Sequence, residues 1–200
     1  MHILTPRLRL YTLAVITYMI TFLVVALLSK NAEFLYYELT MMVIIAVIVF
    51  MDKRVQFSHI VLGGLTFWGF IHLAGGLVPA PQSWTILDIE NPVLYNVKPH
   101  ELMPKYDQFV HAFGFGVALI AAHEALSAHL KTTLKLTIPI GFALFFIAMG
   151  LGALNELIEF VAVISIANTN VGGYENTGWD LVSNAVGAMI ALFYLKFIKR

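Results

Sequence analysis

"PKYDQFVHAFGFGVALIAAHEALS", residues 104–127, combines a long apolar run with an acid and a histidine near its start. About 20 apolar residues are enough to cross the ~30 Å hydrocarbon core of a bilayer as a helix. Residues 107–127 meet that requirement, yet Asp107 and His111 lie four positions apart in the first turns. Ionisable side chains inside a span are costly and usually mark a pathway or a binding site. The stretch therefore predicts a membrane helix and a functional site at one end of it.

The composition of the whole chain favours lipid as its solvent. Of the 200 residues, 60% are hydrophobic and 12% are charged, and the mean hydropathy is +0.83. A soluble domain carries about 25% charged residues and could not hide this much apolar surface. A formal net charge of zero gives no basic footprint for nucleic acid. The absence of cysteine excludes disulfides, thiolate metal sites and thiol nucleophiles.

Hydropathy predicts an all-α, polytopic membrane bundle of about six transmembrane helices. The expected spans are residues 10–29, 34–51, 58–78, 107–127, 136–165 and 180–197, the second of them short. The first apolar run is longer than the core of a signal peptide, so we expect it to be retained as a span. We find no repeat or soluble segment, and we interpret residues 1–200 as a single integral membrane domain.

The distribution of basic residues predicts the orientation. Lysine and arginine accumulate in the cytoplasmic loops of membrane proteins. One side would carry Arg7, Arg9, Lys53, Arg54, Lys131, Lys135, Lys196, Lys199 and Arg200, and the other would carry Lys30, Lys98 and Lys105. We therefore expect both termini in the cytoplasm and a multi-pass protein of the inner (plasma) membrane.

Residues 79–106 form the longest predicted connection, on the external side. The five prolines there exclude a long helix: Pro79, Pro81, Pro92, Pro99 and Pro104. The segment keeps apolar and aromatic residues, and Trp and Tyr prefer the membrane interface. We expect an ordered interfacial flap, with a mobile linker as the alternative.

Polar residues on four expected spans fall at about the same depth. Asp107 and His111 share a helix face, as do Glu156 and Glu159, and Asp180 begins the last span with Ser183 and Asn184 nearby. His72 lies near the outer end of the third span. Four carboxylates so close together need bound protons, cationic partners or a divalent cation. Carboxylates combined with imidazole suit Zn, Mn or Fe(II). The predicted metal ligands are therefore Asp107, His111, Glu156, Glu159, Asp180 and His72.

Simpler roles remain open for several of these side chains. Asp107 and Asp180 could act as helix caps, His111 could be a hydrogen-bonded core histidine, and His72 could support a ligand without being one. Ser183 and Asn184 suit interhelical hydrogen bonds. We expect His59, His123, Glu124 and His129 to be solvated helix ends. Small residues, namely Gly114, Ala118, Gly187 and Ala188, would let the fourth and sixth spans approach closely.

Four segments carry a family resemblance: IHLAGG (71–76), YDQFVHAFGFG (106–116), NELIEF (155–160) and WDLVSNAVGA (179–188). Together they resemble the YjdF-like bacterial inner-membrane proteins, a family of unknown function, and more distantly the VanZ-like membrane proteins. The similarity covers roughly residues 60–195 and implies polar signature positions at Asp107, His111, Glu156, Glu159 and Asp180. Phe160 stands where Trp is expected, and Asn176 where an additional Asp is common, which weakens a ligand on the loop before the last span.

Three functions are compatible with these features. The first is a metal-dependent enzyme at the outer leaflet that acts on a lipid or lipid-linked substrate, with Glu156 and Glu159 as catalytic residues. The second is a proton- or ion-coupled transporter, although the inner halves of the spans are almost wholly apolar. The third is an assembly subunit with a structural polar or metal site, whose partners are other membrane subunits or further copies of the chain.

Overall fold

The computed structural model describes residues 6–198, which form six long helices and two short 3-10 helices. The long helices are α1 (Pro6–Leu28), α2 (Ala32–Val55), α3 (His59–Leu77), α4 (Tyr106–His129), α5 (Ile138–Ser165) and α6 (Tyr174–Phe197). All six are long and apolar enough to cross a membrane. The predicted all-α membrane fold is confirmed, and the chain is a multi-pass membrane protein.

Two helices differ from the predicted spans. The second is not short, because α2 is a 24-residue helix that continues through its charged end to Val55. Its start is fixed by Asn31, whose side chain accepts a hydrogen bond from Phe34 N at 3.1 Å. The sixth helix begins at Tyr174 rather than at residue 180. Hydropathy misses these first turns because their sequence, YENTGW, is polar.

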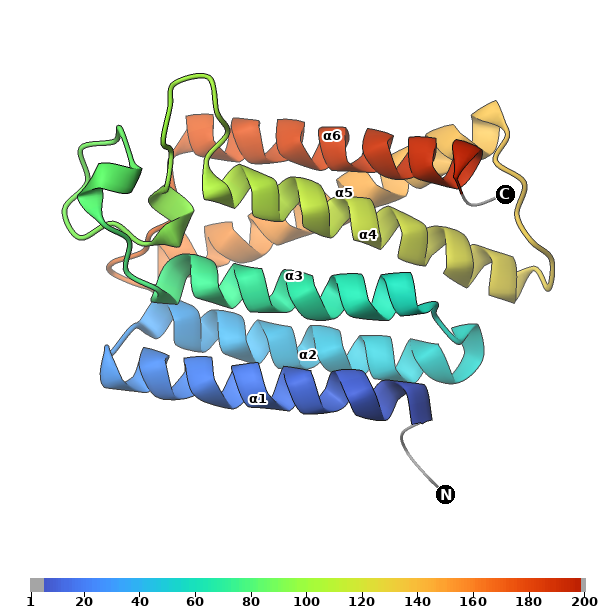
Figure 1. Cartoon of the computed structure of the whole chain (residues 1–200), viewed down its shortest axis with the longest axis horizontal. Coiled ribbons are helices and arrows are strands. Elements are labelled where there is room, and N and C mark those ends of the chain that lie inside the picture. Colours follow the sequence, from blue (N-terminus) through green and yellow to red (C-terminus); the bar gives the residue numbers. More distant parts are fainter. Residues whose placement is uncertain (1–5, 199–200) are drawn as a thin grey trace.

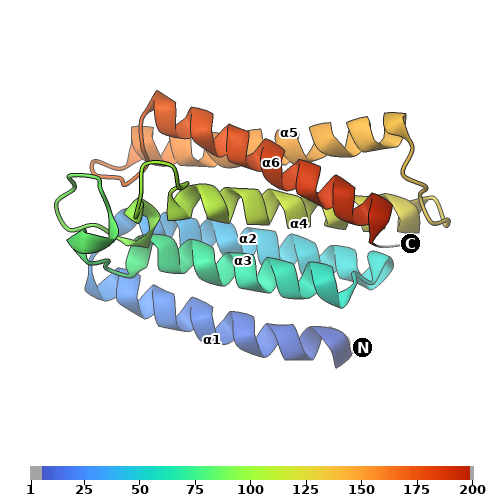
Figure 2. The same cartoon turned by 45° about the horizontal axis from the view of Figure 1, so that its top comes forward.

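Helix α4 lies at the centre of the bundle. It packs against α2, α3, α5 and α6, while α1 lies at the outside against α2 and α3 (Figures 1 and 2). The start of α1 and the end of α6 lie at the same end of the bundle, and the connection from α3 to α4 lies at the opposite end (Figure 1). The starts of α4 and α6 therefore meet the ends of α3 and α5 at that opposite end.

The basic residues expected in the cytoplasm gather where α1 begins and α6 ends. Arg7 lies there and forms an ion pair with the buried Asp52 of α2, with 3.2 Å between Nη2 and Oδ1. Lys199 and Arg200 lie outside the described residues. The side of the membrane on which this end lies stays a prediction.

Small residues bring α4 and α6 together, as expected, but through a partly different set. A Cβ atom on Gly187 would overlap the backbone carbonyl of Ala112, and one on Gly116 would lie 3.0 Å from Gly187 O. The two backbones therefore touch along this line. Gly114 does not contribute to it, because its open side is filled by the indole of Trp68 on α3.

Residues 78–105, between α3 and α4, fold back on themselves. The short helices η1 (Gln82–Trp84) and η2 (Leu94–Asn96) interrupt this segment. Backbone hydrogen bonds join its two arms, from Ala80 N to Pro92 O at 2.8 Å and from Leu94 N to Val78 O at 3.1 Å. This arrangement fits the ordered flap rather than the mobile linker, and its place at a membrane interface stays a prediction.

Candidate metal centre

The start of α4 supplies the first side chains of the site. Lys105 is the N-cap residue, and its backbone N–H donates to Gln108 Oε1 at 2.9 Å. Asp107 lies in the first turn, where an acid complements the helix dipole. Its carboxylate also contacts two cationic or potentially cationic groups, with Lys105 Nζ at 3.7 Å and His111 Nε2 at 3.8 Å. Asp107 therefore does more than stabilise the helix start.

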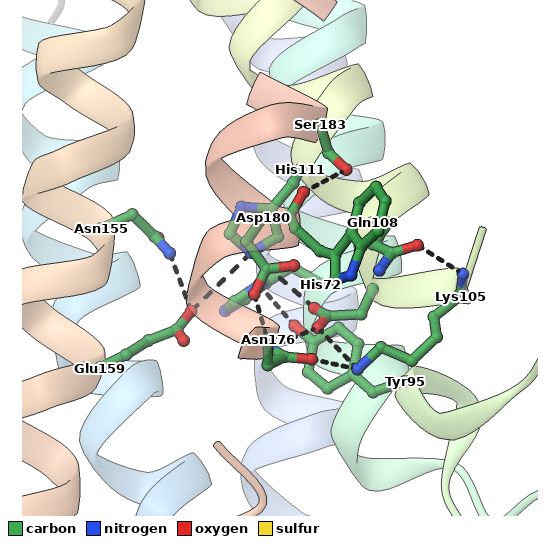
Figure 3. A network of polar contacts seen from close by, with 12 residues as sticks. His72, Tyr95, Lys105, Gln108, His111, Asn155, Glu159, Asn176, Asp180 and Ser183 are labelled. Atoms are coloured by element: carbon green, nitrogen blue, oxygen red, sulfur yellow. Dashed lines mark hydrogen bonds and ion pairs between the residues drawn. The ribbon is translucent and has the colours of Figure 1, made fainter. Parts of the chain in front are cut away.

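Helix α6 presents Asn176, Asp180 and Asn184 on one face toward α4. The last two are fully buried, with 0% of their surface exposed. Asn176 Nδ2 donates to Asp180 Oδ2 at 2.5 Å and to Asp107 Oδ2 at 3.3 Å, while its Oδ1 accepts from Lys105 Nζ (Figure 3). Asp180 lies in the second turn and cannot cap the helix. Asn176 thus links the two aspartates and the lysine.

His111 is the buried centre of the arrangement, with 5% of its surface exposed. Its Nδ1 lies 3.1 Å from Asn184 Oδ1, an oxygen that can only accept. In the neutral imidazole that carries its hydrogen on Nδ1, Asn184 Oδ1 accepts this hydrogen and Nε2 keeps a lone pair. Nε2 faces Asp107 Oδ1 at 3.8 Å and Glu159 Oε1 at 3.9 Å. A partner on the second ring nitrogen is the usual way in which a metal-binding imidazole is oriented.

Helix α5 contributes the two glutamates. Glu156 and Glu159 are three positions apart, so their side chains leave the same face of the helix. Glu159 Oε1 accepts a hydrogen bond from Asn155 Nδ2 at 2.8 Å. Glu156 Oε1 lies 3.8 Å from His111 Nδ1. Both carboxylates of α5 therefore approach the same histidine.

The donor atoms form two groups that share His111. One atom each from Asp107, His111 and Asp180 lie within 4.8 Å of one another, and the same holds for His111, Glu156 and Glu159. Ligands about 2.1 Å from a tetrahedral ion are about 3.4 Å apart, so the donor atoms would have to move together slightly to hold one ion. Asp180 Oδ1 and Glu156 Oε1 are buried and have no hydrogen-bond partner among residues 6–198. The residues therefore fit a divalent ion, for which Zn, Mn and Fe(II) suit the mixture of imidazole and carboxylates.

His72 lies outside both groups, although it is at the predicted depth. Its Nδ1 pairs with the phenol of Tyr95 at 2.6 Å, and its ring stacks on Trp68 with 5.4 Å between the centroids. Tyr95 belongs to η2 and brings the flap onto the bundle (Figure 3). Desolvation raises the pKa of Tyr95 well above its usual range, and the negative charges of Asp107 and Glu159 add to this shift. The phenol therefore stays protonated and can donate to His72.

Several polar residues differ from their expected roles. Asn176 lies in the first turns of α6 rather than on a loop, and it bridges the aspartates. Ser183 bonds within its own helix, to Trp179 O at 2.8 Å, whereas Asn184 does form the expected interhelical bond. His123 is buried rather than solvated, and its Nε2 donates to Leu134 O at 2.8 Å.

Glu124 is also less exposed than expected of a solvated helix end. It is half-buried and accepts a hydrogen bond from Ser58 N at 2.9 Å. The structure brings Tyr95 and Asn155 to the site, and sequence reasoning did not select either. The clue for Asn155 was its position four residues before Glu159, whereas Tyr95 carried no signal beyond its place in an apolar loop.

Comparison with known families extends over nearly the whole chain. A protein-family model described as "Predicted membrane protein (DUF2238)" matches residues 10–200. This match is consistent with the resemblance to the YjdF-like membrane proteins, and it adds nothing to the VanZ-like resemblance. The comparisons with curated proteins and with solved structures find no match.

Proposed function

The chain belongs to the DUF2238 family of predicted membrane proteins, and we propose that it binds a divalent metal ion and acts as a metal-dependent membrane enzyme. The observation that carries the proposal is the pair of donor groups that share His111. They join carboxylates of α4, α5 and α6 to one oriented imidazole. The proposed ion is Zn, Mn or Fe(II), bound by Asp107, His111 and Asp180 or by His111, Glu156 and Glu159.

The depth of the site supports a lipid or lipid-linked substrate. The donor residues lie in the first turns of α4 and α6 and toward the end of α5, so a head group at the membrane surface would reach them. The bias of Lys and Arg toward the other end of the bundle supports a site on the extracytoplasmic side of the inner membrane.

The position of Lys105 favours a substrate with an anionic head group. Its ammonium stands beside Asp107 and Asn176 at the start of α4, where backbone N–H groups and the helix dipole favour negative charge. A phosphoryl group beside Lys105 would meet its ammonium and the free N–H groups of the first turn, with a bound metal ion offsetting the carboxylates. We propose that Lys105 binds the phosphate of the substrate and orients the bond to be cleaved.

The two glutamates have different surroundings, which supports different roles. The Glu159 carboxylate is held by Asn155, so its position is fixed. The Glu156 carboxylate also meets Thr177 and Asn155, yet its Oε1 is buried next to His111 and has no hydrogen-bond partner in residues 6–198. It is placed to accept a proton from a nucleophile within the site. A bound metal would supply an activated water or polarise a phosphoryl or acyl oxygen.

Specific observations bear on the two other functions, a transporter and an assembly subunit. Apolar packing lies between the site and the other end of the bundle, including the buried Leu119, Leu144 and Ala188. It lends no support to an ion or proton path, which counts against a transporter. The bridge that Asn176 forms between Asp107 and Asp180 favours a structural polar network, and hence an assembly subunit that contacts other membrane subunits or further copies of the chain.

Metal analysis tests the proposal. Protein purified in detergent without chelators is analysed by mass spectrometry for Zn, Mn and Fe, together with the variants His111→Ala and Glu156→Ala. Glu175→Ala is the matched control, because this acid lies in the first turn of α6 and is exposed. We expect a stoichiometric metal in the wild type and the control, and its loss from His111→Ala, because His111 belongs to both donor groups. Loss from Glu156→Ala as well assigns the ion to His111, Glu156 and Glu159, whereas retention assigns it to Asp107, His111 and Asp180 and leaves Glu156 free to accept a proton.

If the purified wild type contains no metal and also fails to bind each ion when it is added back, the metal proposal is refuted. That result would favour the structural polar network. Metal retained in both His111→Ala and Glu156→Ala would refute the assignment of the ligands. A positive result leads to a screen of phosphate esters and acyl esters of membrane lipids, with Lys105→Met expected to weaken the use of phosphate esters more than that of neutral acyl esters.

A further inference from the structure

A polar hollow lies at the end of the bundle opposite to the candidate metal centre, where α2 and α4 end and α3 begins (Figure 1). Its volume is about 540 Å³, within the range of about 300–1,000 Å³ that is typical of ligand sites. Apart from Val55 and Ala128, the residues that line it are polar. Because the hollow lies at the ends of membrane helices, it is at the level of lipid head groups rather than of the hydrocarbon core.

The hydroxyl groups of the hollow can donate to a ligand. Ser58 Oγ and Ser127 Oγ each accept a hydrogen bond from a backbone N–H, at 3.3 and 3.1 Å. A hydroxyl that accepts such a bond still has its own hydrogen to donate. Thr132 and Thr133, in the connection between α4 and α5, add two exposed hydroxyls. The lining is therefore rich in donors, which suits an anionic group such as a phosphate.

Positive charge surrounds these donors. Four basic residues line the hollow or flank its lining in the sequence, namely Lys53, Arg54, Lys131 and Lys135. Within residues 6–198, none of the four forms an ion pair. Glu124 is the acid of the lining, and it accepts a hydrogen bond from Ser58 N at the start of α3, where the helix dipole offsets its charge. Asp52 is buried and paired with Arg7. The hollow is therefore positive on balance.

His123 adds an acceptor in the buried part of the lining, where it is 7% exposed. Its Nε2 lies 2.8 Å from Leu134 O, and in the neutral ring with its hydrogen on Nε2 that atom donates to the carbonyl. Nδ1 then keeps a lone pair, and it is buried without a hydrogen-bond partner in the part of the chain that the structure describes. Buried polar atoms usually have a partner. A hydroxyl of a bound molecule would supply one.

From this combination we propose that the hollow binds the head group of phosphatidylglycerol. The phosphate lies beside Lys131 and the hydroxyls of Thr132 and Thr133, and the glycerol hydroxyls extend toward His123. Basic pockets between membrane helices are known to bind anionic head groups. Four basic residues against one acid favour a lipid with net negative charge over a zwitterionic one. This lipid is distinct from the proposed substrate, because it lies at the opposite end of the bundle and its binding needs no metal.

Native mass spectrometry of the detergent-purified protein tests the proposal by counting single bound molecules. The protein is titrated with phosphatidylglycerol, with phosphatidylcholine and with glycerol 3-phosphate, which carries the same phosphate without acyl chains. We expect one phosphatidylglycerol to bind with a lower Kd than the other two. An equal Kd for the two lipids would overturn the proposal. Glycerol 3-phosphate that binds as tightly as the lipid would also overturn it, in favour of a site for a soluble anion.

The backbone of Lys131 permits a substitution that is mild for the fold. Its φ is 53°, in the left-handed region, and it forms the turn in which Thr132 N donates to Ser127 O at 3.1 Å. Glycine is the usual residue at this position after a helix. We therefore expect Lys131→Gly to stay folded, whereas its Kd for phosphatidylglycerol rises about fivefold because one positive charge is lost.

Lys30→Gly is the matched control. Lys30 is exposed and has nearly the same backbone conformation, with a φ of 52°, but it lies between α1 and α2 at the other end of the bundle. We expect its loss to leave the Kd for phosphatidylglycerol unchanged. An equal rise in Kd in the two variants would show that surface charge alone attracts the lipid and would overturn the proposal. An unchanged Kd in Lys131→Gly would overturn it as well.

A second pair of variants tests the hydroxyls without changing any charge. The double variant Thr132→Val and Thr133→Val keeps the shape of both side chains, and Thr137→Val is the control in the same connection, outside the hollow. We expect the Kd for phosphatidylglycerol to rise in the double variant and to stay at the wild-type value in the control. Equal Kd values in the two would place the phosphate away from these threonines and contradict the proposal.

Discussion

Gly187→Ala offers a sharp test of the packing that assembles the site. An alanine Cβ at this position would overlap the backbone carbonyl of Ala112 on α4, and a backbone group cannot move aside as a side chain can. Helices α4 and α6 would have to separate. Because these two helices carry most of the donor residues, their separation would disturb the site. Alanine also gains about 1 kcal/mol of helix propensity over glycine, which partly masks the steric cost.

Gly178→Ala removes that ambiguity. Gly178 lies in the same helix, and no atom is found within 4 Å of the position that its Cβ would take. The propensity gain is common to both variants, so the difference between them is the cost of overpacking, about 1–3 kcal/mol. Unfolding by SDS titration in detergent micelles, followed by tryptophan fluorescence, measures this difference. If Gly187→Ala proves as stable as Gly178→Ala, the close approach of α4 and α6 is wrong.

Three further changes test separate contacts. Tyr95→Phe keeps the ring but removes the hydrogen bond to His72, and we expect it to cost about 1 kcal/mol and to speed backbone hydrogen exchange in η2. Asp52→Ala removes the partner of Arg7 and leaves the buried Phe57 N–H without its acceptor, and we expect a loss of about 1–3 kcal/mol in the same SDS titration. Asn176→Asp adds a carboxylate between two aspartates, so we expect lower thermal stability without metal and a larger stabilisation by added MnCl2 than in the wild type.

Each of these changes has a control at an exposed position. Tyr174→Phe, Asp88→Ala and Asn168→Asp repeat the same chemistry where the side chain faces outward. Equal hydrogen exchange in η2 of the two Tyr variants would exclude Tyr95 as the anchor of the flap. Equal stability of the two Asp variants would show that the Asp52–Arg7 pair contributes nothing to the free energy of unfolding. An Asn176→Asp variant that MnCl2 stabilises no more than the wild type would contradict the placement of the metal beside Asp107.

The spans were predictable because a long apolar run has few alternatives in lipid. All backbone groups must be satisfied within the segment, which leaves the helix as the only single-segment solution. The start of α6 was not predictable in this way. Its first turns are polar and line the site, so hydropathy assigns Asn176 to a loop although it is helical and bonds to Asp107 and Asp180.

The depth of the site residues was also predictable, whereas the direction of each side chain was not. Counting residues from a helix end gives depth at 1.5 Å per residue. It does not give the rotation of the helix about its axis relative to its neighbours. His72 shows the difference, because it lies at the right depth but pairs with Tyr95 from the flap. The spacing of Asp107 and His111 was informative because both lie on one helix and share its rotation.

The residues that allow the helices to approach lie one to two turns from the donor groups, so fold and site depend on each other. On α5, a Cβ on Gly152 would lie 2.5 Å from Asn184 Nδ2, and Glu156 follows one turn later on the same face. Asn184 in turn holds Nδ1 of His111, which leaves Nε2 directed at the carboxylates. A larger side chain at position 152 would displace both Glu156 and the amide of Asn184. The small residues around the site thus set the distances between its donor atoms as well as the packing of the helices.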